Sequence, residues 1–155
     1  MKKMLPLALA LSLIISMLGL PVYADDSSGV YSEVIEFDGG YYCVKTVYEL
    51  SNSSTYTTSS AKTKSGYATI EMFNNSNDLV ATLTVYGTFT YDGRTATATH
   101  ASCDYNISMN GWNCTSADSY CSGDTAYAKA TFEKLLLRDI NATVTLTCSP
   151  SGVLS

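Results

Sequence analysis

The stretch ATLTVYGTFTYDGRTATATHA, residues 81–101, decides the fold class, because apolar and threonine side chains alternate on both sides of a central Asp-Gly pair. Alternation with a period of two is typical of a β-strand that buries one face. An Asp-Gly pair between two such runs predicts a hairpin closed by a two-residue type I′ turn. We therefore expect two antiparallel strands joined at Asp92 and Gly93.

The predicted turn also fixes the strand register, in which Phe89 faces Ala96 and Val85 faces His100. This register places one set of side chains toward the core: Leu83, Val85, Phe89, Ala96 and Ala98. Most threonines then lie on the outward side, as expected for a half-buried antiparallel pair. They form a solvated β face in the simpler interpretation, and in the other a flat threonine array that recognises a regular lattice or polymer.

The same alternation recurs along the chain. Further alternating runs cover residues 31–37, 41–50, 66–73, 77–91, 125–132 and 140–148. Short polar stretches separate these runs, and helical periodicity is hard to find. About eight strands predict an all-β protein, an antiparallel β-sandwich with an immunoglobulin-like outline. A small β-barrel is the alternative.

The N-terminus has the pattern of a secretory signal peptide. Lys2 and Lys3 precede an apolar run from residue 5 to residue 20, and the small-residue motif VYA ends at Ala24. The run is shorter than the roughly 20 apolar residues that a spanning helix needs. We predict a signal peptide over 1–24, a short linker over 25–30 and a single β-sandwich domain over 31–155. The mature protein is expected to be secreted without a membrane span, either free or associated with the cell surface.

Charge limits the possible partners. The chain has 9 basic and 14 acidic side chains, and removal of the two leader lysines leaves 7 basic groups against the same 14 acidic ones. The mature net charge of about −7 opposes binding to a phosphate backbone, so no nucleic acid partner is expected. Anionic membrane surfaces are disfavoured for the same reason.

The five cysteines are disulfide candidates if the chain is exported. They are Cys43, Cys103, Cys114, Cys121 and Cys148. We expect two bridges and one free thiol, with at least one bridge among the three central cysteines. Cys43 and Cys148 are a second candidate pair, although strand alternation places Cys43 with the outward Lys45. No metal site and no cofactor are predicted, because the chain has no CxxC motif and one histidine.

Catalytic patterns are weak in this sequence. A nucleophile needs a base within hydrogen-bond reach. His100 is the single histidine, and Cys103 falls on the opposite face of a regular strand. The chain contains no HExxH, GxSxG or phosphate-loop motif. We therefore predict a protein that is not an enzyme, with a small hydrolase as a minor alternative.

Three segments carry a resemblance to a known group of proteins. They read ATLTVYGTFTYDGRTATAT, GWNCTSADSYCSGDTAYAKATF and VTLTCSPSG. Over roughly residues 66–152 the chain resembles small exported proteins of Gram-positive gut bacteria, a group without a known activity. The resemblance implies an extracellular β-sandwich and supplies no active site.

The candidate ligand-binding residues are Tyr105, Trp112 and Tyr120, all within the segment DYNISMNGWNCTSADSYC at 104–121, which we expect to be a loop at one end of the sandwich. Tryptophan and tyrosine combine a large apolar face with a polar group, which suits stacking on sugars or filling a pocket in a partner. The alternative is that Trp112 is a core residue. We predict a binding module for a glycan, a cell-wall component or a host protein. The other candidate is a structural protein whose threonine-rich sheets pair with further copies.

Overall fold

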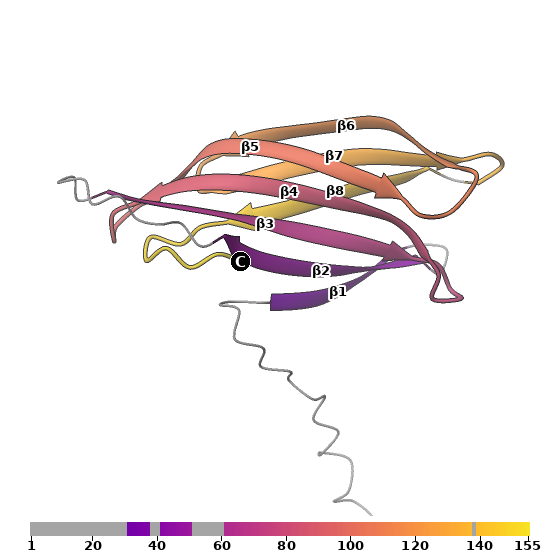
Figure 1. Ribbon diagram of the computed structural model, residues 1–155, viewed down its shortest axis with the longest axis horizontal. Coiled ribbons are helices and arrows are strands. Elements are labelled where there is room, and N and C mark those ends of the chain that lie inside the picture. Colours follow the sequence, from indigo (N-terminus) through magenta and orange to yellow (C-terminus); the bar gives the residue numbers. More distant parts are fainter. Residues whose placement is uncertain (1–30, 38–40, 51–60, 138) are drawn as a thin grey trace, which may run out of the picture.

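The computed structural model describes residues 31–37, 41–50, 61–137 and 139–155, which form eight β-strands (Figure 1). The strands are β1 (Tyr31–Phe37), β2 (Tyr41–Leu50), β3 (Lys62–Phe73), β4 (Leu79–Tyr91), β5 (Ala96–Ile107), β6 (Trp112–Ser122), β7 (Thr125–Lys134) and β8 (Ile140–Thr147). The described residues contain no helix, so the all-β prediction is confirmed. The predicted leader and linker lie outside the described residues.

The strands form two antiparallel sheets. One has five strands in the order β1-β2-β3-β4-β5, and the other has three in the order β6-β7-β8. Strands β7 and β8 lie over the face formed by β3, β4 and β5 (Figure 1). This is the predicted β-sandwich rather than the closed alternative. The two-layer outline is the one that immunoglobulin domains have, whereas the order of the described strands is a simple meander without a Greek-key crossover.

The core lies between the two sheets and follows the alternation in the sequence. Every second residue of β4 points inward, and Leu83, Val85 and Phe89 are fully buried. The facing strand β7 contributes four inward side chains, which are Ala126, Ala128, Ala130 and Phe132. Because most of these are small, the two sheets approach closely, and the larger rings of one sheet fill the space above the alanines of the other.

The β4–β5 hairpin forms, but its turn is longer than predicted. Tyr91 pairs with Ala96, so the turn contains four residues, 92–95. The Asp92 carboxylate accepts hydrogen bonds from the backbone N–H groups of Arg94, at 2.9 Å, and Thr95, at 2.8 Å. Of the two expected turn residues, Gly93 has a positive φ of 90° and Asp92 does not. The type I′ prediction is wrong because the Asp92 side chain stabilises a longer turn.

A β-bulge shifts the remaining register of this hairpin. Phe89 pairs with Ala98 and Thr88 pairs with His100, which leaves Thr99 as one extra residue on β5. The Thr99 hydroxyl donates to the Thr88 carbonyl at 3.0 Å. The predicted inward position of His100 opposite Val85 is therefore wrong, and His100 is exposed on the outward face.

The prediction of which hairpin side chains face the core is nevertheless confirmed. Leu83, Val85, Phe89 and Ala98 are buried, and Ala96 is partly buried and packs against them. The longer turn changes the pairing, but each side chain of this set keeps its face because the bulge at Thr99 comes after Ala98 and leaves the alternation of β4 and of Ala96 to Ala98 intact.

Candidate functional site

Trp112, one of the three predicted ligand-binding residues, lies in the core. Its side chain is 4% exposed. The Tyr41 ring meets it edge-on at a centroid distance of 5.8 Å, and the Lys134 ammonium lies 5.9 Å from the centre of its ring. The indole Nε1–H is buried without a hydrogen-bond partner. The ring therefore offers no free face to a ligand, and the core interpretation of Trp112 replaces the platform interpretation.

The two predicted tyrosines lie on different surfaces. Tyr105 is 44% exposed, and its ring meets the edge of Phe132, which points into the core. Tyr120 is 39% exposed and stacks on Tyr127, which points out of the three-stranded sheet. The structure does not bring Tyr105, Trp112 and Tyr120 together. The segment expected to be a binding loop is mostly strand, the end of β5 followed by β6.

The structure describes all five cysteines and joins none of them. Cys43 pairs with Met72 near the end of β3, and its side chain points inward, contrary to the predicted outward position. Cys148 pairs with Leu154, and the side chain of Leu154 lies against Gly66, which is also in β3. Gly66 and Met72 are six residues apart in β3, about 20 Å at the usual strand rise. A Cys43–Cys148 bridge would need Cα atoms within about 7 Å, so this candidate pair is wrong.

The central cysteines are also unpaired. Cys103, Cys114 and Cys121 are free thiols, and Cys121 is exposed. The expected bridge among these three is absent from the structure, and so is the expected total of two bridges. The physical reason is their placement, because they lie at separate positions along β5 and β6, whereas bridged cysteines need opposed Cβ atoms at a short distance.

We expect thiol reactivity to separate these residues. Burial raises the pKa of the Cys43 thiol to about 12, so the reactive thiolate is scarce at pH 8. In folded protein treated with iodoacetamide, Cys121 should be alkylated rapidly and Cys43 should remain unmodified, as read by peptide mass spectrometry. In denaturant all five cysteines should react. Equal labelling of Cys43 and Cys121 in the folded state would contradict the burial of Cys43.

The outer face of the five-stranded sheet carries a feature that the sequence analysis did not identify. Tyr48, Tyr67 and Tyr86 lie opposite one another on β2, β3 and β4, and we call them the tyrosine row. The rings of Tyr48 and Tyr67 stack at a centroid distance of 4.6 Å, and those of Tyr67 and Tyr86 lie 5.7 Å apart with a tilt of 39°. The row therefore crosses three neighbouring strands without a break.

Hydroxyl groups border the tyrosine row on both sides. Thr46, Thr69 and Thr84 are aligned across β2, β3 and β4, and the hydroxyls of Thr69 and Thr84 are 2.9 Å apart. On the other side of the row, the hydroxyls of Ser65 and Thr88 are 3.0 Å apart. Thr84 and Thr88 lie outward, as the alternation of the hairpin predicted, and Thr46 and Thr69 lie on the same face. They surround the aromatic row instead of forming a threonine array by themselves.

Tyr86 ends the row and is 39% exposed. One side of its ring is next to Tyr67, whereas the residue opposite it on β5 is the small Ser102. Asp104 and His100 lie opposite Thr84 and Thr88 and so flank Ser102 on β5; both are exposed. The side of the Tyr86 ring that faces β5 is therefore not covered by a large side chain, because Ser102 is small, and Asp104 and His100 lie beside this open side. This arrangement suits a ligand that stacks on an aromatic ring while it forms hydrogen bonds.

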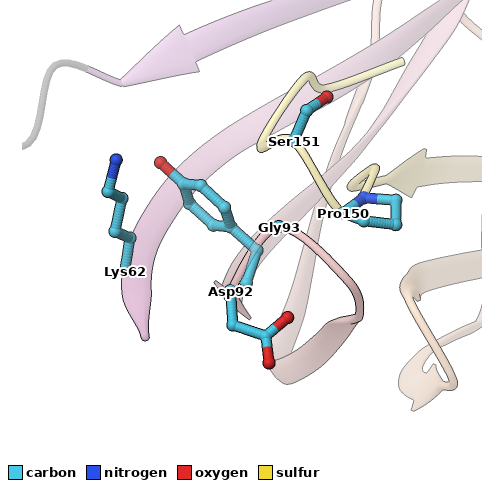
Figure 2. A pocket seen from close by; sticks show the side chains of 6 residues that line it. Lys62, Asp92, Gly93, Pro150 and Ser151 are labelled. Atoms are coloured by element: carbon cyan, nitrogen blue, oxygen red, sulfur yellow. The ribbon is translucent and has the colours of Figure 1, made fainter. Parts of the chain in front are cut away.

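A small pocket lies between the β4–β5 turn and the C-terminal segment (Figure 2). Its volume is about 150 Å³, and its lining includes Lys62, Asp92 and Pro150. The backbone N–H groups of Thr95 and Arg94 hold the pKa of the Asp92 carboxyl below its usual value. In Figure 2 this carboxylate points away from Lys62. The pocket is smaller than the roughly 300 Å³ at which ligand sites begin, and its one acid is engaged in the turn.

The residues that the structure describes lack two further features. They include no helix long and apolar enough to cross a membrane. They also include no group of three or more histidine, cysteine and acidic side chains that could hold a metal ion. Comparisons of the chain with models of protein families, with curated proteins and with solved structures found no match.

Proposed function

We propose that the protein is an extracellular, non-catalytic binding module that holds a neutral glycan chain on the outer face of its five-stranded sheet. The observation that carries this proposal is the tyrosine row with its open end at Tyr86. Tyrosine rings offer apolar surface to the C–H faces of sugars, and their hydroxyls bind sugar hydroxyls. The threonines and the serine on either side of the tyrosine row supply further hydrogen-bond donors and acceptors on the same face of the sheet.

The shape of this face favours a polymer over a small molecule. Neighbouring strands repeat the same groups at about 4.8 Å, so contacts on β2, β3 and β4 recur at a regular interval. Successive units of a polymer can contact the groups on β2, β3 and β4 one after another, whereas the described part of this flat face has no cavity that would enclose a small molecule. The net charge of −5 for the whole chain favours a neutral polysaccharide over an anionic one. A cell-wall component of the same chemistry would fit equally.

Export and the absence of catalysis are parts of this proposal. Export is supported by the leader pattern over 1–24, and mass spectrometry of protein from the culture medium would show whether the chain starts at Asp25. The absence of catalysis is supported by the placement of His100, which points outward while Cys103 packs against the core. These two groups therefore cannot form a nucleophile–base pair.

The binding test compares two tyrosines with the same exposed fraction. Tyr86 and Tyr120 are each 39% exposed, but they lie on different sheets. In pull-downs with insoluble neutral polysaccharides and on a glycan array, Tyr86→Ala should weaken binding about tenfold, the loss typical of a hot-spot aromatic. Tyr120→Ala should bind as the unmodified protein does. Both variants should keep its melting temperature, since both side chains are partly solvated.

The proposal predicts a specific difference between the two variants. Equal losses for both, or binding that neither substitution alters, would exclude the tyrosine row as the site. An absence of binding to every neutral glycan would exclude the function itself.

Self-association is the second candidate function. Strands β1 and β8 occupy outer positions in their sheets, and each pairs along one side with a strand of its own sheet. The outer side of such a strand presents backbone N–H and C=O groups to a further strand. Light scattering over a range of concentrations without glycan distinguishes the candidates, because self-association predicts growing assemblies and the binding module predicts a constant mass.

A further inference from the structure

The turn between β7 and β8 displays three consecutive leucines, which we call the leucine turn. Leu135, Leu136 and Leu137 are 87%, 95% and 48% exposed. The turn is closed by a hydrogen bond of 3.0 Å from the Leu137 N–H to the Lys134 carbonyl. In Figure 1 this turn projects beyond the strands at the end of the three-stranded sheet. Large apolar side chains that are grouped and exposed in this way mark interaction sites.

The backbone of the leucine turn is also unfavourable for leucine. Leu136 has a φ of +67°, a region that glycine and asparagine adopt more readily than leucine does. Asn77, in the turn between β3 and β4, shows the residue type that usually takes this conformation, with a φ of +64°. Position 136 thus combines backbone strain with an apolar side chain in water. Glycine would avoid both, so packing within the fold does not account for the leucine.

We propose that the leucine turn inserts into the interface of an uncharged lipid bilayer and holds the protein there reversibly. A bilayer fits a convex apolar tip because lipids close around it without a preformed pocket. Lys134 and Arg138 flank the three leucines in the sequence.

Charge identifies the kind of lipid surface. Glu133 and Asp139 adjoin the two basic residues, so the segment 133–139 has no net charge. The chain as a whole is acidic, which opposes approach to anionic lipids. Insertion must therefore depend on apolar burial, and its strength should change little with salt. A zwitterionic phosphatidylcholine surface meets these conditions.

The size of the leucine turn sets the expected affinity. Three leucine side chains carry nearly as many carbon atoms as one myristoyl chain, which binds membranes with a constant of about 10⁴ M⁻¹. Leu137 is half-buried, so this value is an upper bound for the turn. Contact should be weak and reversible, which suits a peripheral protein. The tyrosine row lies on the outer face of the other sheet and stays free in such an orientation.

Flotation with phosphatidylcholine vesicles tests the proposal. The double variant Leu135→Ser/Leu136→Gly should bind at least tenfold more weakly than the unmodified chain. Val153→Ser is the matched control, since Val153 is an apolar side chain that is 60% exposed near the C-terminus, far along the chain from the turn. It should leave binding unchanged. All three proteins share the same N-terminal segment, so a difference between them reports on the substituted residues.

A second measurement separates insertion from a structural role of the leucines. Leu136→Gly should raise the melting temperature, because glycine relieves the positive φ, while vesicle binding falls. A fall in both would mean that Leu136 stabilises the fold and would overturn the proposal. Two other results would also overturn it: no binding of the unmodified chain to the vesicles, or a dimer in solution that the double variant abolishes, since the turn would then dock on a second copy.

Discussion

Replacement of Trp112 by alanine should lower the free energy of unfolding by about 3 to 5 kcal/mol, the usual cost of removing a large buried aromatic side chain. The ring lies between Tyr41 of β2 and Lys134 of β7, and so contacts both sheets at one end of the sandwich. Its loss should leave a cavity that the strand backbones cannot close. Chemical denaturation followed by far-UV circular dichroism measures this loss directly.

Trp112→Phe is the control that isolates the indole N–H. Nε1 is a buried donor without a partner, and a group of this kind costs about 1 to 3 kcal/mol. Phenylalanine removes that donor and keeps an aromatic ring next to Tyr41, so its destabilisation should be clearly smaller than that of alanine. Similar losses for both substitutions would show that Nε1–H has a partner in solution. A negligible loss for alanine would mean that Trp112 is not a core residue.

The sequence was sufficient to predict which residues of β4 face the core, whereas it placed Cys43 of β2 and His100 of β5 on the wrong faces. Alternation along β4 identified Leu83, Val85 and Phe89 as inward, because one buried face of a strand requires a period of two. The same signal located β1 and β2 at the bounds that the structure has. Burial along β4 follows from the alternation of that strand alone, so a local pattern was enough to predict it there.

Strand register was not predictable from these patterns. The Asp92 carboxylate closes a longer turn with two backbone N–H groups, and the extra Thr99 forms a bulge. The longer turn and the bulge both depend on side-chain hydrogen bonds that compete with the regular backbone hydrogen bonds between the strands. The Asp-Gly pair in the sequence does not indicate either feature. The position of His100 was wrong for this reason.

The candidate site was missed because it depends on three registers at once. Tyr48, Tyr67 and Tyr86 lie far apart in the sequence and align when β2, β3 and β4 pair as they do. Equal spacing of these tyrosines, 19 residues each time, was the available signal. The segment 104–121 was predicted to be a loop because its side chains are mostly small and polar, so the part that forms β6 shows little apolar alternation. The position of Trp112 consequently stayed open between a binding surface and the core, and the structure places it in the core.

Phe89→Ala should be as costly as Trp112→Ala, with a loss of about 3 to 5 kcal/mol, since its ring is fully buried between the sheets. The ring lies over Gly87, two residues before it on the same strand. A Cβ atom at position 87 would be 2.7 Å from the Phe89 ring and 3.1 Å from the Ala126 Cβ. Gly87→Ala should therefore overpack the core and cost about 1 to 3 kcal/mol by itself.

The losses of unfolding free energy that these two substitutions cause should not be additive when they are combined, and this is the more specific test of the packing. Once Phe89 is alanine, the ring that would clash with a Cβ at position 87 is gone, and the new methyl group occupies part of the cavity. In the Phe89→Ala background, Gly87→Ala should thus be neutral or stabilising, which gives a coupling energy of about 1 to 3 kcal/mol between the two positions. Denaturation of the four proteins of this cycle measures the coupling. Losses that add to within about 0.5 kcal/mol would mean that the Phe89 ring does not lie over Gly87. The close approach of β4 to β7 would then have to result from the small side chains of Ala126 and Ala128, and not from the absence of a side chain at Gly87.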